Sequence, residues 1–227
     1  MIKIKRKNTD KARQAVVDLE KAKQSGSTYN TENVNQALRE IFHRKCYICE
    51  YKQATSYQIE HLIPHRENTD LKYDWNNLFL VCAHCNNIKL AKYDPILDCT
   101  KEPVEKLIAF RKKGYFGFKE ELEFTPVGIE NETVKNTVAL LKDAYYGTTD
   151  QKKFEARIIR KALRKDIAQF KEYVREYQEA EDEEEREEMV YLLKKELQDS
   201  SEFVAFKRWL IWDNKMYSEL EKYIPQN

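Results

Sequence analysis

Two pairs of cysteines constrain the fold of this chain more than any other feature of its sequence. Cys46 and Cys49 form one CxxC pair, and Cys82 and Cys85 form a second pair 32 residues further on. Together they supply the four thiolates of a closed tetrahedral zinc site. Such a site leaves no open position, so we expect a structural ion whose binding energy contributes to folding. Cys99 stands alone and is expected to be a buried apolar side chain.

The first residues of the chain and its hydropathy indicate the cellular compartment of the protein. Residues 1–10, "MIKIKRKNTD", are charged where a signal peptide would be apolar. No apolar run approaches the roughly 20 residues that span a bilayer. We therefore expect a cytoplasmic protein without a membrane partner. Disulfides are rare in that compartment, which favours a metal over two disulfides.

Glycine and proline are scarce, at five residues each in 227, against typical usage of roughly 7% and 5%. This predicts a mainly α fold with long helices. Short strands are expected at 56–62 and 77–82, a helix begins at 83, and residues 114–124 have strand character. The other predicted helices span 10–24, 31–43 (with Thr31 as N-cap), 102–114, 132–146, 150–180, 188–198 and 201–224.

Charge is divided unevenly along the chain. Residues 1–127 hold 22 Lys and Arg against 17 Asp and Glu, a net of +5, whereas residues 128–227 hold 18 against 22, a net of −4. The basic, cysteine-bearing half suits a phosphate-bearing partner. The acidic run 181–188 is either a solvated face or connection, or a docking surface for a basic partner. A basic stripe is either soluble surface or a phosphate contact; it consists of Lys153, Arg157, Arg160, Lys161 and Arg164.

The segment between the cysteine pairs carries residues that a structural zinc site does not need. Glu60 and His61 are adjacent, Asn77 lies in "DWNNLFL" (74–80), and Asn86 directly follows Cys85. An acid–histidine pair, a downstream asparagine and an asparagine at a helix start are the parts of a one-metal phosphodiesterase.

The stretches "CYICE", "YQIEHLIPH" and "YDWNNLFLVCAHCNNIK" resemble the HNH (ββα-metal) endonuclease family in its zinc-stapled form. More narrowly, they are similar to the HNH components of Septu-type and retron-associated anti-phage defence systems. The resemblance covers residues 44–92. It implies a small ββα-metal core at about 44–100, stapled by a four-cysteine zinc site within residues 1–127. A helical region, 128–227, would follow and dock a partner.

The resemblance also implies roles for single residues. His61 would be the general base, and an imidazole can take a proton from water near neutral pH. Glu60 and Asn86 would hold a catalytic Mg²⁺ or another divalent ion through oxygen. The alternatives are a surface charge paired with a lysine for Glu60 and an N-cap for Asn86. Asn77 would fix the loop that carries the histidine through backbone hydrogen bonds.

Other matched positions receive weaker expectations. His65 stands where close relatives often have lysine and is a candidate nucleic-acid contact. Lys89 would either reach a phosphate or cover the strand. His84 is expected to be exposed. Glu50 and Trp75 would support the site by packing.

The function implied is metal-dependent hydrolysis of phosphodiester bonds, with DNA favoured and RNA, including tRNA, left open. The chain has no GxxxxGK[ST] sequence, so an ATPase would act in trans. The resembled systems use an ABC/SMC-like ATPase, sometimes with a retron reverse transcriptase and its RNA. Two alternatives remain, a non-catalytic zinc module that binds nucleic acid or protein and a stand-alone restriction-type endonuclease.

Overall fold

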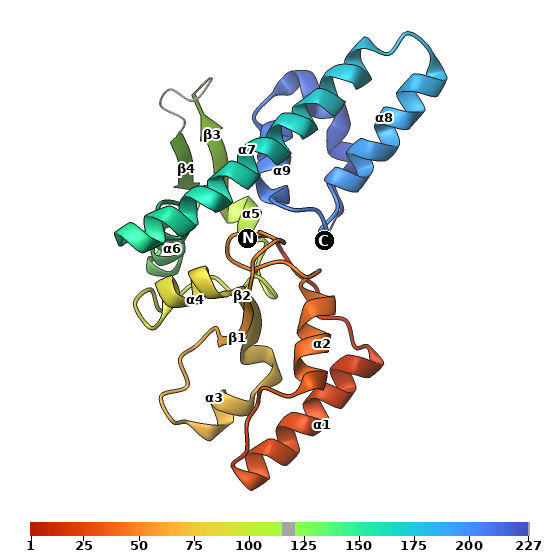
Figure 1. The fold of residues 1–227 in the computed structure, drawn as a ribbon. Helices are drawn as coiled ribbons and strands as arrows, with labels where there is room; N and C mark the ends of the chain where they lie inside the picture. The colour runs from red at the N-terminus through yellow and green to blue at the C-terminus, as the bar shows by residue number, and fades with distance from the viewer. Residues whose placement is uncertain (115–120, 227) are drawn as a thin grey trace.

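The computed structural model describes residues 1–114 and 121–226, and its element order is shown in Figure 1. The chain opens with an antiparallel helix pair, α1 (Asp10–Ser25) and α2 (Glu32–Ile41). Gly26 ends α1 at φ 69°, a left-handed conformation that glycine adopts without steric cost. Thr31 caps α2 by accepting from the amide of Val34, as predicted. The helix ends two residues earlier than predicted.

A small ββα unit follows, which Figure 1 places between the α1–α2 pair and the later helices α6 and α7. Strands β1 (Tyr57–His61) and β2 (Leu78–Cys82) pair antiparallel, with Tyr57 opposite Cys82 and His61 opposite Leu78. All five residues of β2 are buried. The helix α4 (Ala83–Lys89) begins directly after β2. Two short elements, α3 (Thr69–Tyr73) and the 3-10 helix η1 (Trp75–Asn77), lie in the β1–β2 connection.

The helix predicted at 102–114 is wrong for most of its length. Only α5 (Val104–Leu107) is helical, and β3 (Ile108–Lys113) pairs antiparallel with β4 (Glu121–Pro126). Phe110 lies opposite Phe124, with ring centroids 5.3 Å apart. This long-range pairing overrides the local helical pattern. The strand character predicted at 114–124 is found at its end in β4, while 115–120 lie outside the described residues.

The C-terminal half is helical, as predicted, but the helix predicted at 201–224 is divided into an α-helix and a 3-10 helix. It contains α6 (Glu132–Tyr146), α7 (Asp150–Glu179), α8 (Glu183–Glu196), α9 (Val204–Trp212) and the 3-10 helix η2 (Lys215–Tyr223). The acidic run, 181–188, comprises the two residues before α8 and the start of that helix, and the carboxylates in its first turn interact favourably with the helix dipole. Among the described residues, no helix is both long enough and apolar enough to span a bilayer.

The larger apolar core joins both halves of the chain. It contains Ile48, Phe79, Leu140, Leu163 and Phe206, which come from the first cysteine pair, β2, α6, α7 and α9. Tyr145 Oη donates to the carbonyl of Cys49 at 2.8 Å in a buried hydrogen bond. The C-terminal helices therefore pack directly on the segment that carries the first cysteine pair.

Candidate active site and metal centre

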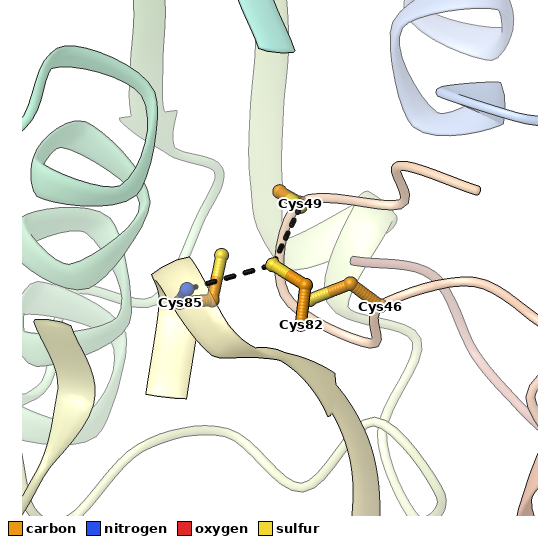
Figure 2. A group of neighbouring side chains, drawn as sticks. All are labelled: Cys46, Cys49, Cys82 and Cys85. Carbon is orange, nitrogen blue, oxygen red and sulfur yellow. Dashed lines mark hydrogen bonds between the residues drawn. The ribbon is translucent and has the colours of Figure 1, made fainter. Parts of the chain in front are cut away.

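The four paired cysteines meet in one buried cluster (Figure 2). Cys46 and Cys49 come from the loop after α2, Cys82 ends β2, and Cys85 lies in the first turn of α4. Their sulfur atoms all lie within 4.8 Å of one another, and Cys49 Sγ and Cys82 Sγ are 3.9 Å apart. The ββα arrangement brings the two pairs together because β2 delivers Cys82 and α4 follows at once.

The cluster has the dimensions of a tetrahedral metal site. A bond length of about 2.3 Å from zinc to sulfur places tetrahedral sulfur atoms about 3.8 Å apart, close to the Cys49–Cys82 separation. Burial raises the pKa of Cys49 and Cys85, so these thiols stay protonated without a cation. Cys99 lies outside the cluster and is fully buried, as predicted, and burial raises its pKa to about 12.

His61 ends β1, and its ring is held from the side of α3. Its Nε2 lies 2.9 Å from the backbone carbonyl of Lys72. A carbonyl can only accept, so Nε2 carries the hydrogen and Nδ1 keeps the lone pair in the neutral ring. The ring packs edge-on against Tyr29 and His65, with centroids 4.8 and 4.7 Å away. Burial lowers the pKa of His61, and the neighbouring His65 lowers it further.

Asn77 connects the two ends of the segment that follows His61. Its Nδ2 donates to the carbonyls of Ile63 and Leu71 at 2.9 and 3.0 Å, and its Oδ1 accepts from the amide of Ile63 at 2.8 Å. The backbone carbonyl of Asn77 accepts from the amide of Leu62. One buried amide side chain thus holds the loop on which the position of the His61 ring depends. Asn76 makes no such connection and is exposed.

The Glu60 side chain lies on the opposite face of β1 from His61 and is buried. Successive strand residues point to opposite faces, and the Glu60 carboxylate lies toward α4. Its Oε1 is 2.6 Å from Lys89 Nζ, and its Oε2 accepts from Tyr47 Oη at 3.1 Å. Burial raises the pKa of Glu60 to about 7, although Lys89 and Tyr47 act in the opposite direction. The short contact to Lys89 and the raised pKa have one cause, the removal of both charges from water.

Lys89 is the centre of this buried group. Its Nζ donates to the carbonyl of His61 at 3.2 Å and lies 3.7 Å from Asp94 Oδ1. The lysine is fully buried. The expectation that Lys89 reaches a phosphate is therefore corrected, and the alternative, that it covers the strand, describes its position. Among the described residues, Asp94 Oδ2 is buried without a hydrogen-bond partner.

Asn86 lies one helical turn before Lys89, on the same side of β1 as Glu60. Its Nδ2 donates to Gln58 Oε1 at 2.6 Å. The side chain that caps α4 is that of Cys82, which accepts from the amide of Cys85, so the N-cap alternative for Asn86 is wrong. The side-chain nitrogen of Asn86 makes this hydrogen bond, and its side-chain oxygen is a ligand of the type that a hard cation prefers.

The donors predicted for a divalent cation fit only in part. Asn86 and Glu60 share one face of β1, but both Glu60 oxygens already have partners and its side chain is 8% exposed. His61 belongs to the other face. Both Glu60 oxygens are therefore engaged in this arrangement, and the role predicted for Glu60 as a ligand of the divalent ion stays a prediction. The alternative for Glu60 was a surface charge paired with a lysine; the pairing with Lys89 is found, but the surface position is wrong because the pair is buried.

Three other expectations meet clear structural outcomes. His84 is buried rather than exposed, with Nε2 2.8 Å from the Ala144 carbonyl and Nδ1 2.8 Å from Glu155 Oε2. His43, expected on the helix before the first cysteine pair, follows α2 at φ 52°. Trp75 packs as expected, beneath the Arg6 guanidinium.

Glu50 is buried and supports the fold. Its carboxylate accepts from the amide of Ala205 at 3.3 Å and lies 3.5 Å from Lys45 Nζ. It therefore ties the first cysteine pair to the start of α9. Sequence reasoning missed several further partners, namely Tyr29, Tyr47, Gln58, Lys72 and Asp94. Of these, the strand alternation that places Gln58 beside Glu60 was visible in the sequence.

Comparison with known families agrees with this geometry. Residues 46–92, about a fifth of the chain, match the family model described as HNH endonuclease. No curated protein matches the chain. The matched range begins at the first cysteine of the cluster and includes β1, β2 and α4. The chain therefore carries an HNH endonuclease domain at residues 46–92, whose two cysteine pairs form one four-sulfur cluster.

Proposed function

We propose that this chain is an HNH-type nuclease that hydrolyses phosphodiester bonds of nucleic acid, with DNA preferred, and that His61 is its general base. The observation that carries the proposal is the position of His61 within the matched domain. Its Nε2–H is committed to the Lys72 carbonyl, which leaves the basic Nδ1 for a water molecule. DNA is preferred because it is the usual target of the family that the sequence resembles.

In the proposed reaction, His61 takes a proton from water as the water attacks phosphorus in line with the leaving 3′ oxygen. Burial lowers the pKa of His61, so the imidazole is neutral and able to accept a proton at pH 7. Asn77 acts as a positioning residue because it holds the loop after His61. His65, half-buried against the His61 ring, is proposed as a contact to a phosphate. The products would carry 5′-phosphate and 3′-hydroxyl ends.

We assign two different roles to metal ions. Zinc is proposed for the four-sulfur cluster, where it would be structural. A divalent ion such as Mg²⁺, when bound at the active site, would stabilise the charge that grows on the phosphate. Asn86 would hold this ion through its amide oxygen. Glu60 would join it only if Lys89 moved away from the carboxylate.

Cleavage by paired histidine variants tests the proposal. Nicking of a supercoiled plasmid with Mg²⁺ is compared for wild type, His61→Asn and His43→Asn, each with its zinc content and melting temperature measured. Loss of a positioned base typically costs about 10²–10⁴ in rate, so His61→Asn should lose that much and His43→Asn almost nothing. His43 is a matched control because asparagine tolerates its left-handed backbone. Equal cleavage by both folded variants would make the nuclease assignment wrong.

The same assay separates the remaining alternatives. A non-catalytic zinc module would bind nucleic acid or protein and cleave nothing under any of these conditions. A stand-alone restriction-type endonuclease would cleave as the purified chain. Replacing the plasmid with single-stranded RNA or tRNA distinguishes the DNA preference from an RNA preference.

We further propose that the helical C-terminal half docks a partner ATPase, as in the anti-phage systems that the sequence resembles. An ABC/SMC-like ATPase, alone or with a retron reverse transcriptase and its RNA, is the proposed class. Support comes from the resemblance and from the lack of a GxxxxGK[ST] sequence in these 227 residues. Full cleavage by the chain without any ATPase would contradict this part of the proposal.

A further inference from the structure

The first half of α7 presents a basic face. Residues 152–165 contain seven Lys and Arg and one acid, Glu155. That acid is engaged by His84 and Lys152, and on the outer side Lys153 pairs with Asp150 at the start of the helix. The exposed cations define the α7 basic face; they are Lys153, Arg157, Lys161, Arg164 and Lys165.

Two large apolar side chains are exposed at the start of this face. Phe154 is 56% exposed and Ile158 is 47% exposed. The guanidinium of Arg157 lies over the Phe154 ring, 5.0 Å from its centroid. Cations interleaved with an exposed aromatic ring are the composition that proteins use to hold unpaired bases and their phosphates.

A pocket lies between the first half of α7 and the HNH domain. Its volume is about 260 Å³, and it lies between the loop after the first cysteine pair, α4 and α7. Ser56 and Asn87 line it on one side, and Lys152 and Ile158 line it on the other. Ser56 lies two residues before Gln58, and Asn87 directly follows Asn86. The pocket therefore lies beside the segments that carry the Gln58–Asn86 pair.

The spacing of the cations suits the phosphodiester backbone of a nucleic acid. Lys153, Arg157, Lys161 and Lys165 recur every four residues, which is about 6 Å along a helix axis and about 18 Å in all. At a rise of about 3.4 Å per nucleotide in one strand, that length covers about five nucleotides.

We infer that the α7 basic face, outside the HNH domain, binds the nucleic-acid strand that the proposed nuclease cleaves. The inference rests on the proposed nuclease function for the identity of its ligand. A nucleic acid is favoured over an acidic protein because α7 packs beside the HNH domain, with Lys152 and Asn87 lining one pocket, and because an exposed aromatic side chain, Phe154, lies among the cations.

Binding can be measured separately from cleavage in a full-length His61→Asn background. Fluorescence anisotropy with a labelled 20-nucleotide single strand and a 20-base-pair duplex is recorded from 50 to 300 mM salt. The test variant is Arg157→Gln/Lys161→Gln/Lys165→Gln. The control, Lys194→Gln/Lys195→Gln/Lys215→Gln, removes the same charge from exposed positions on α8 and η2. A Phe154→Ser variant tests stacking.

We expect the test variant to weaken binding at least tenfold at low salt and to reduce the slope of log K against log salt by about two to three, while the control keeps both. Phe154→Ser should weaken single-strand binding about fivefold or more and affect the duplex less. Equal binding by test and control variants would overturn the inference. The inference would also be overturned if the test variant changed only the self-association of the chain, measured by sedimentation, because the face would then bind a second copy of the chain.

The two proposals fail in different ways. Retained cleavage by His61→Asn in the otherwise wild-type chain would remove the nuclease assignment without changing the anisotropy result. Loss of the salt slope in the test variant would support the binding face whatever the cleavage assay gives.

Discussion

At the scale of single residues, the most consequential arrangement is the buried pair of Glu60 and Lys89. Both side chains are at least nine-tenths buried, and Lys89 also bonds the carbonyl of His61. The pair therefore fixes the backbone at the end of β1, beside the proposed base. The sequence motif indicates both residues, but their partnership depends on α4 lying across β1, which no local pattern specifies.

A double-mutant cycle tests this pair. Glu60→Gln and Lys89→Met should each destabilise the fold by about 3–5 kcal/mol, because each leaves an uncompensated buried charge. The double variant should cost clearly less than the sum. Urea unfolding gives all three values, and strictly additive losses would contradict the pairing.

Other site residues differ in how far the sequence could predict them. The hydrogen bonds of Asn77 agree with the bonding pattern expected from the motif, because they are made to backbone atoms within 14 residues of it. The burial of His84 could not be predicted, since its partners at Ala144 and Glu155 come from helices 60 to 71 residues away.

At the scale of elements, the cysteine cluster joins β2 and α4 to the first cysteine loop, and α6 and α7 pack against it. Tyr145 bonds the Cys49 carbonyl, and His84 in α4 contacts α6 and α7. The strands at the cluster were predictable from alternating and apolar runs bounded by the cysteine pairs. The β3–β4 hairpin could not be predicted in this way. Residues 108–113 have a helical pattern locally, and they form a strand because Phe110 pairs with Phe124 on β4.

Metal removal should therefore loosen more than the HNH domain. We expect Cys85→Ser to lose the bound zinc and to speed amide hydrogen exchange in β1, β2, α4 and α6, because metal binding is coupled to folding. Cys99→Ser is the control, since Cys99 lies outside the cluster and should keep one zinc ion per chain. Unchanged exchange in Cys85→Ser after confirmed zinc loss would contradict a structural role.

At the scale of the whole molecule, the larger apolar core contains residues from both sides of residue 127, where the balance of basic and acidic residues changes. Ile48 and Phe79 on one side share this core with Leu140 and Phe206 on the other. Charge asymmetry and the change to uninterrupted helices were visible in the sequence. The shared core could not be predicted. An amphipathic stripe shows that one face of a helix is buried, but it does not show which other element that face packs against.

A chain ending at residue 127 should accordingly fail to fold. It would expose apolar surface that α6, α7 and α9 cover, at roughly 25 cal/mol per Å² of apolar area returned to water. Near-ultraviolet circular dichroism and amide exchange of this fragment, with zinc supplied, measure the outcome. A cooperatively melting fragment with native-like exchange protection would show that the shared core is dispensable.

The measurement that tests the central claim most directly is the pH dependence of phosphodiester cleavage in wild type and His61→Asn. Burial lowers the pKa of His61, so the base is neutral above that pKa and becomes protonated as pH falls. The wild-type rate should rise with pH along a single-proton limb whose midpoint lies below 6.5, and then level off. His61→Asn should be about 10²–10⁴ slower and lack that limb. A His61→Asn enzyme with the wild-type rate and limb would contradict the account.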